Sequence, residues 1–305
     1  MLKYVLKRVI LAIVSIFIII SLTFFLMNAV PGGPFDSEKA PDPAVKAVIE
    51  ARYHLDKPLL QQYGIYLNNL FHGDFGISLK SGRDISTTIF ESFSISAKLG
   101  GTAMLLAVVF GLCFGCLAAI KRNKLIDRII VFMTTLFVAV PSFILATYLL
   151  RIFCTQLGWF PAWQVNQPWH FYVLPIVALM LYPMSYITRL TKSSMLDVLG
   201  QDYIRTARAK GVSEKKVIFK HALRNALIPV ITYVGPMTAF ILTGSLVVEK
   251  VFTIGGLGSK FVTGITDRDY PMIMATTIFL AVLVVIMTLV SDLLYKVVDP
   301  KITFD

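Results

Sequence analysis

Long apolar stretches recur along the 305-residue chain, and shorter polar segments separate them. A helix that crosses a bilayer needs about 20 consecutive, mainly apolar residues. Six segments reach that length, and the pattern predicts a membrane-spanning helix in each: residues 9–30, 99–120, 129–150, 172–190, 226–247 and 272–292. The sequence therefore predicts an all-α polytopic membrane protein.

The first span begins after three basic residues, as a signal peptide would. Its apolar stretch from Val9 to Val30 is too long for a typical signal core, and the "MNAVPGG" that overlaps its end shows no convincing cleavage site. We therefore expect a retained helix. The predicted organisation is an N-terminal end with the first helix at 1–30, a loop region at 31–98 and a transmembrane core at 99–305.

Composition supports lipid as the main solvent, since 56% of the residues are hydrophobic, 15% are charged and the mean hydropathy is +0.73. A net charge of +11 is found in some nucleic-acid-binding proteins, but in a membrane protein it first indicates basic residues held in the cytoplasm. Eighteen of the 29 Lys and Arg residues fall in the two ends and in the loops at 121–128 and 189–225. The positive-inside rule then predicts cytoplasmic termini and a cytoplasmic 189–225 loop.

The loop at 31–98 is nearly neutral, and this topology places it outside the cytoplasm. Prolines and glycines break any regular structure at its start, after which "PAVKAVIEARYHL" and "LLQQYGIYLNNLFHG" have helical patterns. The pattern predicts a small folded extracytoplasmic feature. It is equally consistent with a lid or docking surface and with a structured spacer.

Signs of chemistry within the chain are weak. Cys113 and Cys116 form a CxxC without further ligands, so a packing role is favoured, and the four histidines have no metal-ligand spacing. The Gly-rich "GGLGSK" at 255–260 lacks the Gly-Lys-Ser/Thr ending of a phosphate loop, and ionisable residues are absent from the middles of the spans. We therefore expect no catalytic residue, no metal site and no cofactor in this chain, which is not predicted to be an enzyme.

Small and cyclic residues in the spans indicate how the helices pack. Gly111 and Gly115 form a GxxxG motif, which lets two helices approach closely. Five prolines are expected to interrupt helical hydrogen bonding, either as static kinks or along a translocation pathway: Pro141, Pro175, Pro183, Pro229 and Pro236. Pore-lining residues remain unassigned.

The segment from Arg189 to Arg224 holds nine basic and three acidic residues. Its pattern predicts two short helices joined at Gly211, which can adopt a left-handed conformation, with Ser213 capping the second helix and Glu214 in its first turn. Lys216, Lys220 and Arg224 would share one face of that helix. Phe219, Leu223 and Leu227 would form an adjacent apolar line toward the bundle.

A basic loop that touches anionic lipid would account for the charge of this segment. It would not account for the glycine break or for the small pair Thr206-Ala207, which lets another surface approach closely. The pattern therefore favours a protein partner.

"DYIRTARAKG" with "HALRNALIPV" resembles the EAA loop of ABC-importer permeases, in the version of the peptide-importer branch. Arg205-Thr206-Ala207 occupy the Glu-Ala-Ala positions of the general motif. Nearly the whole chain is similar to B-type permeases of this branch, through "LDKPLLQQYGIYLNNLFHGDFGISL", "GSLVVEKVFTIGGLG", "RDYPMIMA" and "DLLYKVVDPKI".

The resemblance implies six helices of the type I importer kind, with a long extracytoplasmic loop after the first and a cytoplasmic coupling-helix elbow between the fourth and fifth. It also implies an ATPase-coupling role for thirteen residues: Asp202, Tyr203, Arg205, Thr206, Ala207, Arg208, Gly211, Ser213, Glu214, His221, Leu223, Arg224 and Asn225.

The implied partners are a second permease, either a homologue or a second copy of this chain, two ATPase subunits that bind ATP and Mg²⁺, an extracytoplasmic peptide-binding protein, the peptide and membrane lipid. Nucleic acid is not among them. The implied location is a bacterial or archaeal inner or plasma membrane. Nickel chelates or oligosaccharides are alternative cargoes, whereas a membrane enzyme would need polar residues at depth and a stand-alone channel would leave the elbow unexplained.

Overall fold

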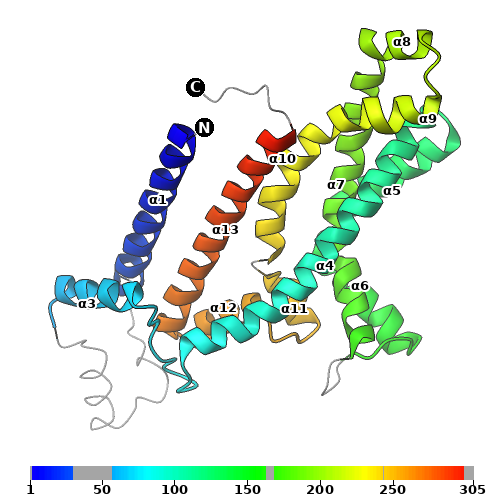
Figure 1. Cartoon of the computed structure of the whole chain (residues 1–305). Helices are drawn as coiled ribbons and strands as arrows, with labels where there is room; N and C mark the ends of the chain where they lie inside the picture. Colours follow the sequence, from blue (N-terminus) through cyan, green and yellow to red (C-terminus); the bar gives the residue numbers. More distant parts are fainter. Residues whose placement is uncertain (1, 30–56, 163–167, 243, 299–305) are drawn as a thin grey trace. The chain divides into compact units, whose positions relative to one another are not determined.

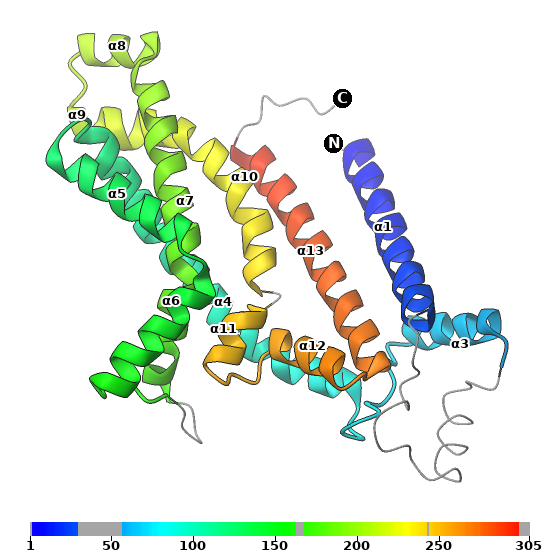
Figure 2. The same ribbon diagram turned by 180° about the vertical axis from the view of Figure 1, so that it is seen from behind.

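The structure is a computed structural model that describes residues 2–29, 57–162, 168–242 and 244–298, and its elements are helices (Figures 1 and 2). Within these residues the single extended pairing is an isolated bridge between Ile77 and Asp84. The chain forms two compact units. The first comprises residues 1–94 and 256–282, and the second comprises residues 95–255 and 283–305.

Five stretches of the described residues are long and apolar enough to cross a membrane. They contain α1 (Leu2–Ala29), α4 (Ile85–Ile120), α7 (Val173–Leu199), α10 (Leu223–Leu242) and α13 (Tyr270–Val298). The helical stretch that holds α10 begins earlier, at α9 (Glu214–Lys216) and the π-helix η3 (Val217–Ala222), and a short 3-10 helix η2 (Trp169–Tyr172) precedes α7. These stretches confirm five of the predicted spans.

The predicted span at 129–150 is not a straight helix. Its residues divide between α5 (Leu125–Ala139) and α6 (Ser142–Leu149), and α6 continues into the π-helix η1 (Leu150–Gln156). The two arms meet at a bend of 100°. Pro141 causes the break, because a proline disfavours helical geometry in the preceding residue, and Val140 is extended with ψ 120°. By length and composition, the described residues hold up to six candidate spans if the bent pair counts as one.

The first unit joins α1, α3 (Leu59–Phe71), the start of α4, α12 (Leu257–Thr266) and the start of α13. Both views show α3 lying across the end of α1 (Figures 1 and 2). The buried core of the unit consists of Ile85, Ile89, Leu257, Met272 and Ala275. The helix predicted from "LLQQYGIYLNNLFHG" is confirmed as α3, whereas "PAVKAVIEARYHL" lies outside the described residues.

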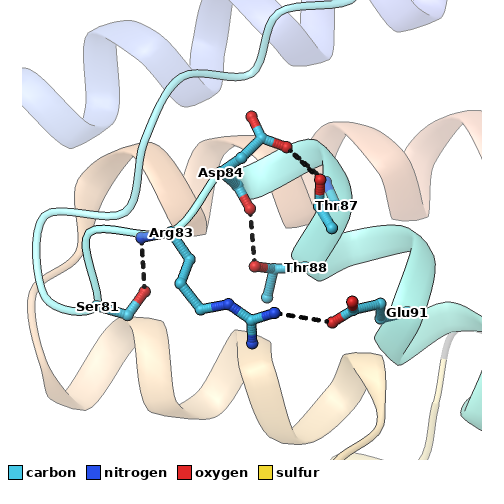
Figure 3. A network of polar contacts seen from close by, with 6 residues as sticks. All are labelled: Ser81, Arg83, Asp84, Thr87, Thr88 and Glu91. Carbon is cyan, nitrogen blue, oxygen red and sulfur yellow. Dashed lines mark hydrogen bonds and ion pairs between the residues drawn. The ribbon is translucent and has the colours of Figure 1, made fainter.

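Polar side chains fix the start of α4 (Figure 3). The Asp84 Oδ1 atom accepts hydrogen bonds of 2.7 Å from both the backbone N–H and the hydroxyl of Thr87, which satisfies a free donor of the first turn. The backbone bond and then the hydroxyl bond hold the pKa of Asp84 below its usual value. The Arg83 guanidinium forms a 3.2 Å ion pair with the carboxylate of Glu91, eight residues later. In the same unit, buried Asp269 accepts from Ser78 Oγ at 2.5 Å.

The second unit packs the rest of α4 against α7 through the predicted GxxxG motif. A Cβ at Gly111 would lie 2.7 Å from Ile187 Cγ2, and one at Gly115 would lie 2.5 Å from Thr191 Cβ. No side chain larger than hydrogen fits at those distances without movement, so the close-approach prediction is confirmed. Cys116 is buried as expected, whereas Cys113 is exposed on the same helix.

Three of the five prolines lie inside helices: Pro183 in α7, with Pro229 and Pro236 in α10. Pro175 is the third residue of α7. A backbone N–H at this position would have no partner within the helix, so a proline, which lacks that N–H, removes no helical bond there. The expectation that it interrupts the hydrogen-bond ladder is therefore wrong.

Candidate functional site

The segment 201–225 folds as the predicted helix–glycine–helix unit, which we call the elbow. Its first helix is α8 (Asp202–Ala209), and its second part runs from α9 through η3 into α10. In the figures the elbow lies beyond the end of α7, within the second unit (Figure 1). The elbow therefore connects two spans, α7 and α10, through one short crosswise helix.

Gly211 ends α8 with a left-handed backbone, at φ +76°. Its N–H donates to the Arg208 carbonyl at 2.9 Å, and the Val212 N–H donates to the Ala207 carbonyl at 3.2 Å. This pair of bonds is a Schellman motif, which satisfies the free carbonyls of a helix end. The predicted conformation of Gly211 is confirmed. Among the described residues nothing lies within 4 Å of a Cβ built there, so backbone geometry alone requires glycine in this chain.

Two neighbouring residues of α8, Tyr203 and Ile204, contact the rest of the second unit. Ile204 is fully buried in a cluster with Met195, Val217 and Ala222, among others. Tyr203 remains 43% exposed, but its hydroxyl accepts a 2.7 Å hydrogen bond from Asn225 Nδ2 at the start of α10. Because the two contacts lie next to each other on α8, they fix its orientation with little of its surface buried.

A forked ion pair closes the turn around Gly211. The Arg208 guanidinium donates to both Glu214 oxygens, at 2.7 and 3.2 Å. The hydrogen bond to Glu214 raises the pKa of Arg208, and the charge of Glu214 adds to the effect. Both side chains are exposed to solvent, so the pair adds little to stability. Its role is geometric, because a two-point contact sets the angle between α8 and α9.

The thirteen residues of the predicted coupling site differ in their exposure to solvent. Exposed are Asp202, Tyr203, Arg205, Thr206, Arg208, Gly211, Ser213, Glu214, Arg224 and Asn225, whereas Ala207, His221 and Leu223 are half-buried. Ala207 packs on the cluster below α8, so only Thr206 of the small pair is open to a partner. Ser213 occupies the predicted N-cap position, but its side chain makes no capping hydrogen bond.

The apolar line expected along the second helix is confirmed at Leu223, which packs against the buried cluster, and is wrong at Phe219. The buried residues there are Val217, Ile218, Ala222 and Ala226, whereas Phe219 is 60% exposed. The segment Val217–Ala222 is π-helical, and its wider turn shifts the register that an α-helical spacing assumes. Lys216, Lys220 and Arg224 are exposed as expected.

Comparison with known proteins matches residues 111–304 to the family described as binding-protein-dependent transport system inner membrane component. Residues 1–100 match the N-terminal family of membrane components of the same transport systems. The chain belongs to this family. Its members are permease subunits of ABC importers, and the chain is thus a multi-pass membrane protein of that kind.

Curated relatives cover the full length of the chain. The dipeptide transport system permease protein DppB of Bacillus subtilis is 48% identical over 99% of this chain and 98% of its own. The oligopeptide transport system permease protein OppB of Haemophilus influenzae is 44% identical over 100% of both chains. OppB of Escherichia coli is 42% identical over 100% of both.

Solved structures confirm the fold. The MetNI methionine ABC transporter in an inward-facing conformation matches with a TM-score of 0.56, at 18% identity, over 69% of this chain and 95% of the other. An amino acid ABC transporter solved with histidines matches with a TM-score of 0.53, over 71% and 95%. At this identity the likeness concerns the architecture of an importer permease and not its cargo.

One supporting contact of the elbow was missed by sequence reasoning. Lys192 of α7 forms a 2.5 Å ion pair with Asp127 near the start of α5, and the backbone N–H of Asn123 donates to the same carboxylate. Asp127 is 5% exposed. A buried charge is stable only when it is paired, so this contact joins the α4–α5 turn to the part of α7 that leads into α8. In the sequence, Asp127 is the single acidic residue of the basic stretch "KRNKLIDR", and this could have indicated an ion pair.

Proposed function

We propose that this permease takes up oligopeptides or dipeptides that an extracytoplasmic binding protein delivers, with ATP hydrolysis in partner subunits as the energy source. The elbow is the surface that meets an ATPase subunit. The observation that carries this proposal is the state of α8: one fully buried side chain and one tyrosine hydrogen bond hold it in place, and most of its remaining residues are exposed. Such a helix is ordered and available for a partner.

The proposed complex contains a second permease subunit, two ATPase subunits and the binding protein. ATP and Mg²⁺ are bound by the ATPases, and the permease itself performs no chemistry. When ATP closes the ATPases, a load on α8 would pass to α7 through the chain and to α10 through the Tyr203–Asn225 and Arg208–Glu214 contacts. Rigid helices joined in this way can alternate access to a path between the subunits.

Peptide cargo is supported by the names of the full-length relatives. Nickel chelates and oligosaccharides are the alternative cargoes. Deleting this gene in its host and measuring the uptake of labelled dipeptides, longer peptides, nickel and oligosaccharides distinguishes them. We expect peptide uptake to fall and to return when the gene is restored. Normal peptide uptake with a loss of nickel or sugar uptake would assign the other cargo.

Docking of α8 on an ATPase can be tested by photo-crosslinking from exposed positions of the elbow. A benzophenone amino acid at Thr206 or Ala209 should crosslink to an ATPase subunit in the assembled complex. The same group at Phe143, an exposed residue of α6, should not. A complex that shows uptake but no crosslink from either elbow position would contradict the docking role.

The proposed topology places both termini and the elbow in the cytoplasm, and α3 outside. In a chain whose native cysteines are replaced by alanine, a membrane-impermeant thiol reagent added to intact cells should label Asn68→Cys but not Lys215→Cys. Both native residues are exposed, so folding does not hide either site. Labelling at 215 without cell lysis would reverse the topology.

A further inference from the structure

Helix α3 differs in its chemistry from α8 and α12, which both carry charged residues. None of its thirteen described residues, "LLQQYGIYLNNLF", is charged, and none is fully buried. Two large apolar side chains are instead among the most exposed in the structure, with Leu60 at 74% and Phe71 at 84%. The apolar residues of α3 lie along two edges of the helix, and only one edge faces the rest of the protein. Packing against the protein therefore does not account for the other apolar edge.

The first edge of α3 contacts α1. The Tyr63 hydroxyl lies 2.6 Å from Ser21 Oγ, and the rings of Tyr63 and Tyr66 lie 5.2 and 5.4 Å from the ring of Phe24. Phe24 is 4% exposed, whereas Leu22 beside it is 55% exposed. Aromatic rings thus attach α3 to one side of α1 and leave another side of α1 open.

These contacts set the level of α3 along a membrane-spanning helix. The apolar span of α1 runs from Leu6 to Ala29, and the contacts with α3 lie between Ser21 and Phe25. At 1.5 Å per residue they lie about 6 to 12 Å before the end of the span. That is the depth of the boundary between headgroups and acyl chains, where tyrosines are enriched.

The second edge of α3 is the exposed one. Leu60, Gly64, Leu67 and Phe71 follow one another at spacings of three and four residues, so they form one stripe on the helix surface. At 100° per residue this stripe adjoins the edge that holds Tyr63 and faces α1 along one border, and exposed Gln61 and Asn68 lie beyond its other border. The stripe therefore continues an apolar surface that begins on α1.

At this level Leu22 and Leu26 project from the candidate membrane span of α1 with exposures of 55% and 63%, as lipid-facing side chains do. The stripe of α3 carries no charged or hydrogen-bonding side chain, and it adjoins this surface at the level where a span reaches the headgroup boundary. We propose that α3 is an interfacial helix that lies in the plane of the membrane surface, with the Leu60–Phe71 stripe in contact with lipid acyl chains. This inference depends on neither the cargo nor the side of the membrane.

The test uses the full-length chain with alanine at its three native cysteines, reconstituted in vesicles of phosphatidylethanolamine and phosphatidylglycerol. Single cysteines replace Leu60 or Phe71 on the stripe, and Gln61 or Asn68 on the polar side as matched controls. Each carries a nitrobenzoxadiazole label. Quenching is measured with a lipid that has a nitroxide high on its acyl chain and, separately, with iodide in the water.

We expect the nitroxide lipid to quench the labels at 60 and 71 at least about twofold more than those at 61 and 68, and iodide to show the reverse order. High salt should not change this pattern, because α3 carries no charge to be screened. Equal iodide quenching at all four positions would show that the stripe faces water. Protection of 60 and 71 from both quenchers would show that protein covers it. Either result overturns the proposal.

Discussion

Helices α8 and α3 have a similar build and opposite chemistry. Each is a short helix outside the main spans, and a tyrosine hydroxyl contacts a residue of a neighbouring span in both, Asn225 for Tyr203 and Ser21 for Tyr63. The exposed surface of α8 is charged, whereas that of α3 is uncharged and carries an apolar stripe. Helices that are attached to the bundle in a similar way can thus have different proposed partners, a protein for α8 and lipid for α3. The chemistry of the exposed side chains distinguishes the two.

The largest difference is expected from substitutions at a glycine in or next to each of the two helices. Gly211 beside α8 and Gly64 within α3 both have open space where a Cβ would project among the described residues, but only Gly211 has a positive φ. A leucine at 211 costs on the order of 1 kcal/mol or more in local strain and distorts the turn that orients α8. We expect Gly211→Leu to abolish most uptake while the spans remain inserted, and Gly64→Leu to leave uptake unchanged.

Two further variants separate the causes at Gly211. Asn tolerates a left-handed backbone, so Gly211→Asn should retain more uptake than Gly211→Leu. Gly115→Leu should instead lower the amount of assembled protein, because its Cβ would lie 2.5 Å from Thr191. Normal uptake and normal assembly with Gly211→Leu would contradict the coupling role of the elbow.

The second prediction concerns the buried anchor of each helix. Ile204→Ala removes the one fully buried side chain of α8, and Phe24→Ala removes the ring on which Tyr63 and Tyr66 of α3 pack. In a protein core such changes cost about 2 to 5 kcal/mol. Hydrogen exchange should accelerate in α8 for the first variant and in α3 for the second. Acceleration in both helices with either variant would mean that they unfold as one unit.

The third prediction separates the two tyrosines of α3. Tyr63→Phe loses the contact with Ser21, and removing such a hydrogen bond costs about 1 kcal/mol. The buried Tyr66 hydroxyl has no hydrogen-bond partner among the described residues, and burial raises the pKa of Tyr66 well above its usual value. Tyr66→Phe should therefore leave thermal stability unchanged or raise it. A loss as large as that of Tyr63→Phe would reveal a polar partner for Tyr66.

The smallest effect is expected at the ion pair of the elbow. Arg208→Gln leaves the fold intact and removes an ion pair whose two side chains are exposed to solvent. Uptake should fall modestly in low salt, and the difference from the unmodified protein should shrink as salt screens the pair. A severe loss at every salt concentration would mean that Arg208 contacts the ATPase directly.

Much of the elbow could be predicted because its signals are local. A glycine between two helical patterns identifies the break, and the left-handed conformation follows from helix-end geometry at Gly211. The buried face of the second helix could not be predicted, since Phe219 is exposed and Ile218 is buried. A π-turn has no reliable local signal, and it changes the register on which every facial assignment depends.

The sequence by itself determined five of the six predicted spans, the interruption at Pro141, the close approach at Gly115 and the membrane-permease family. Apolar length, the proline ring and the missing side chain of glycine each act locally, without a partner from elsewhere in the chain. Only the tertiary structure decided which polar groups meet. Lys192 and Asp127 are 65 residues apart in the chain, and Ser21 and Tyr63 are 42 apart. Such pairs form because packing brings distant helix faces together, and no periodicity within either segment specifies the partner.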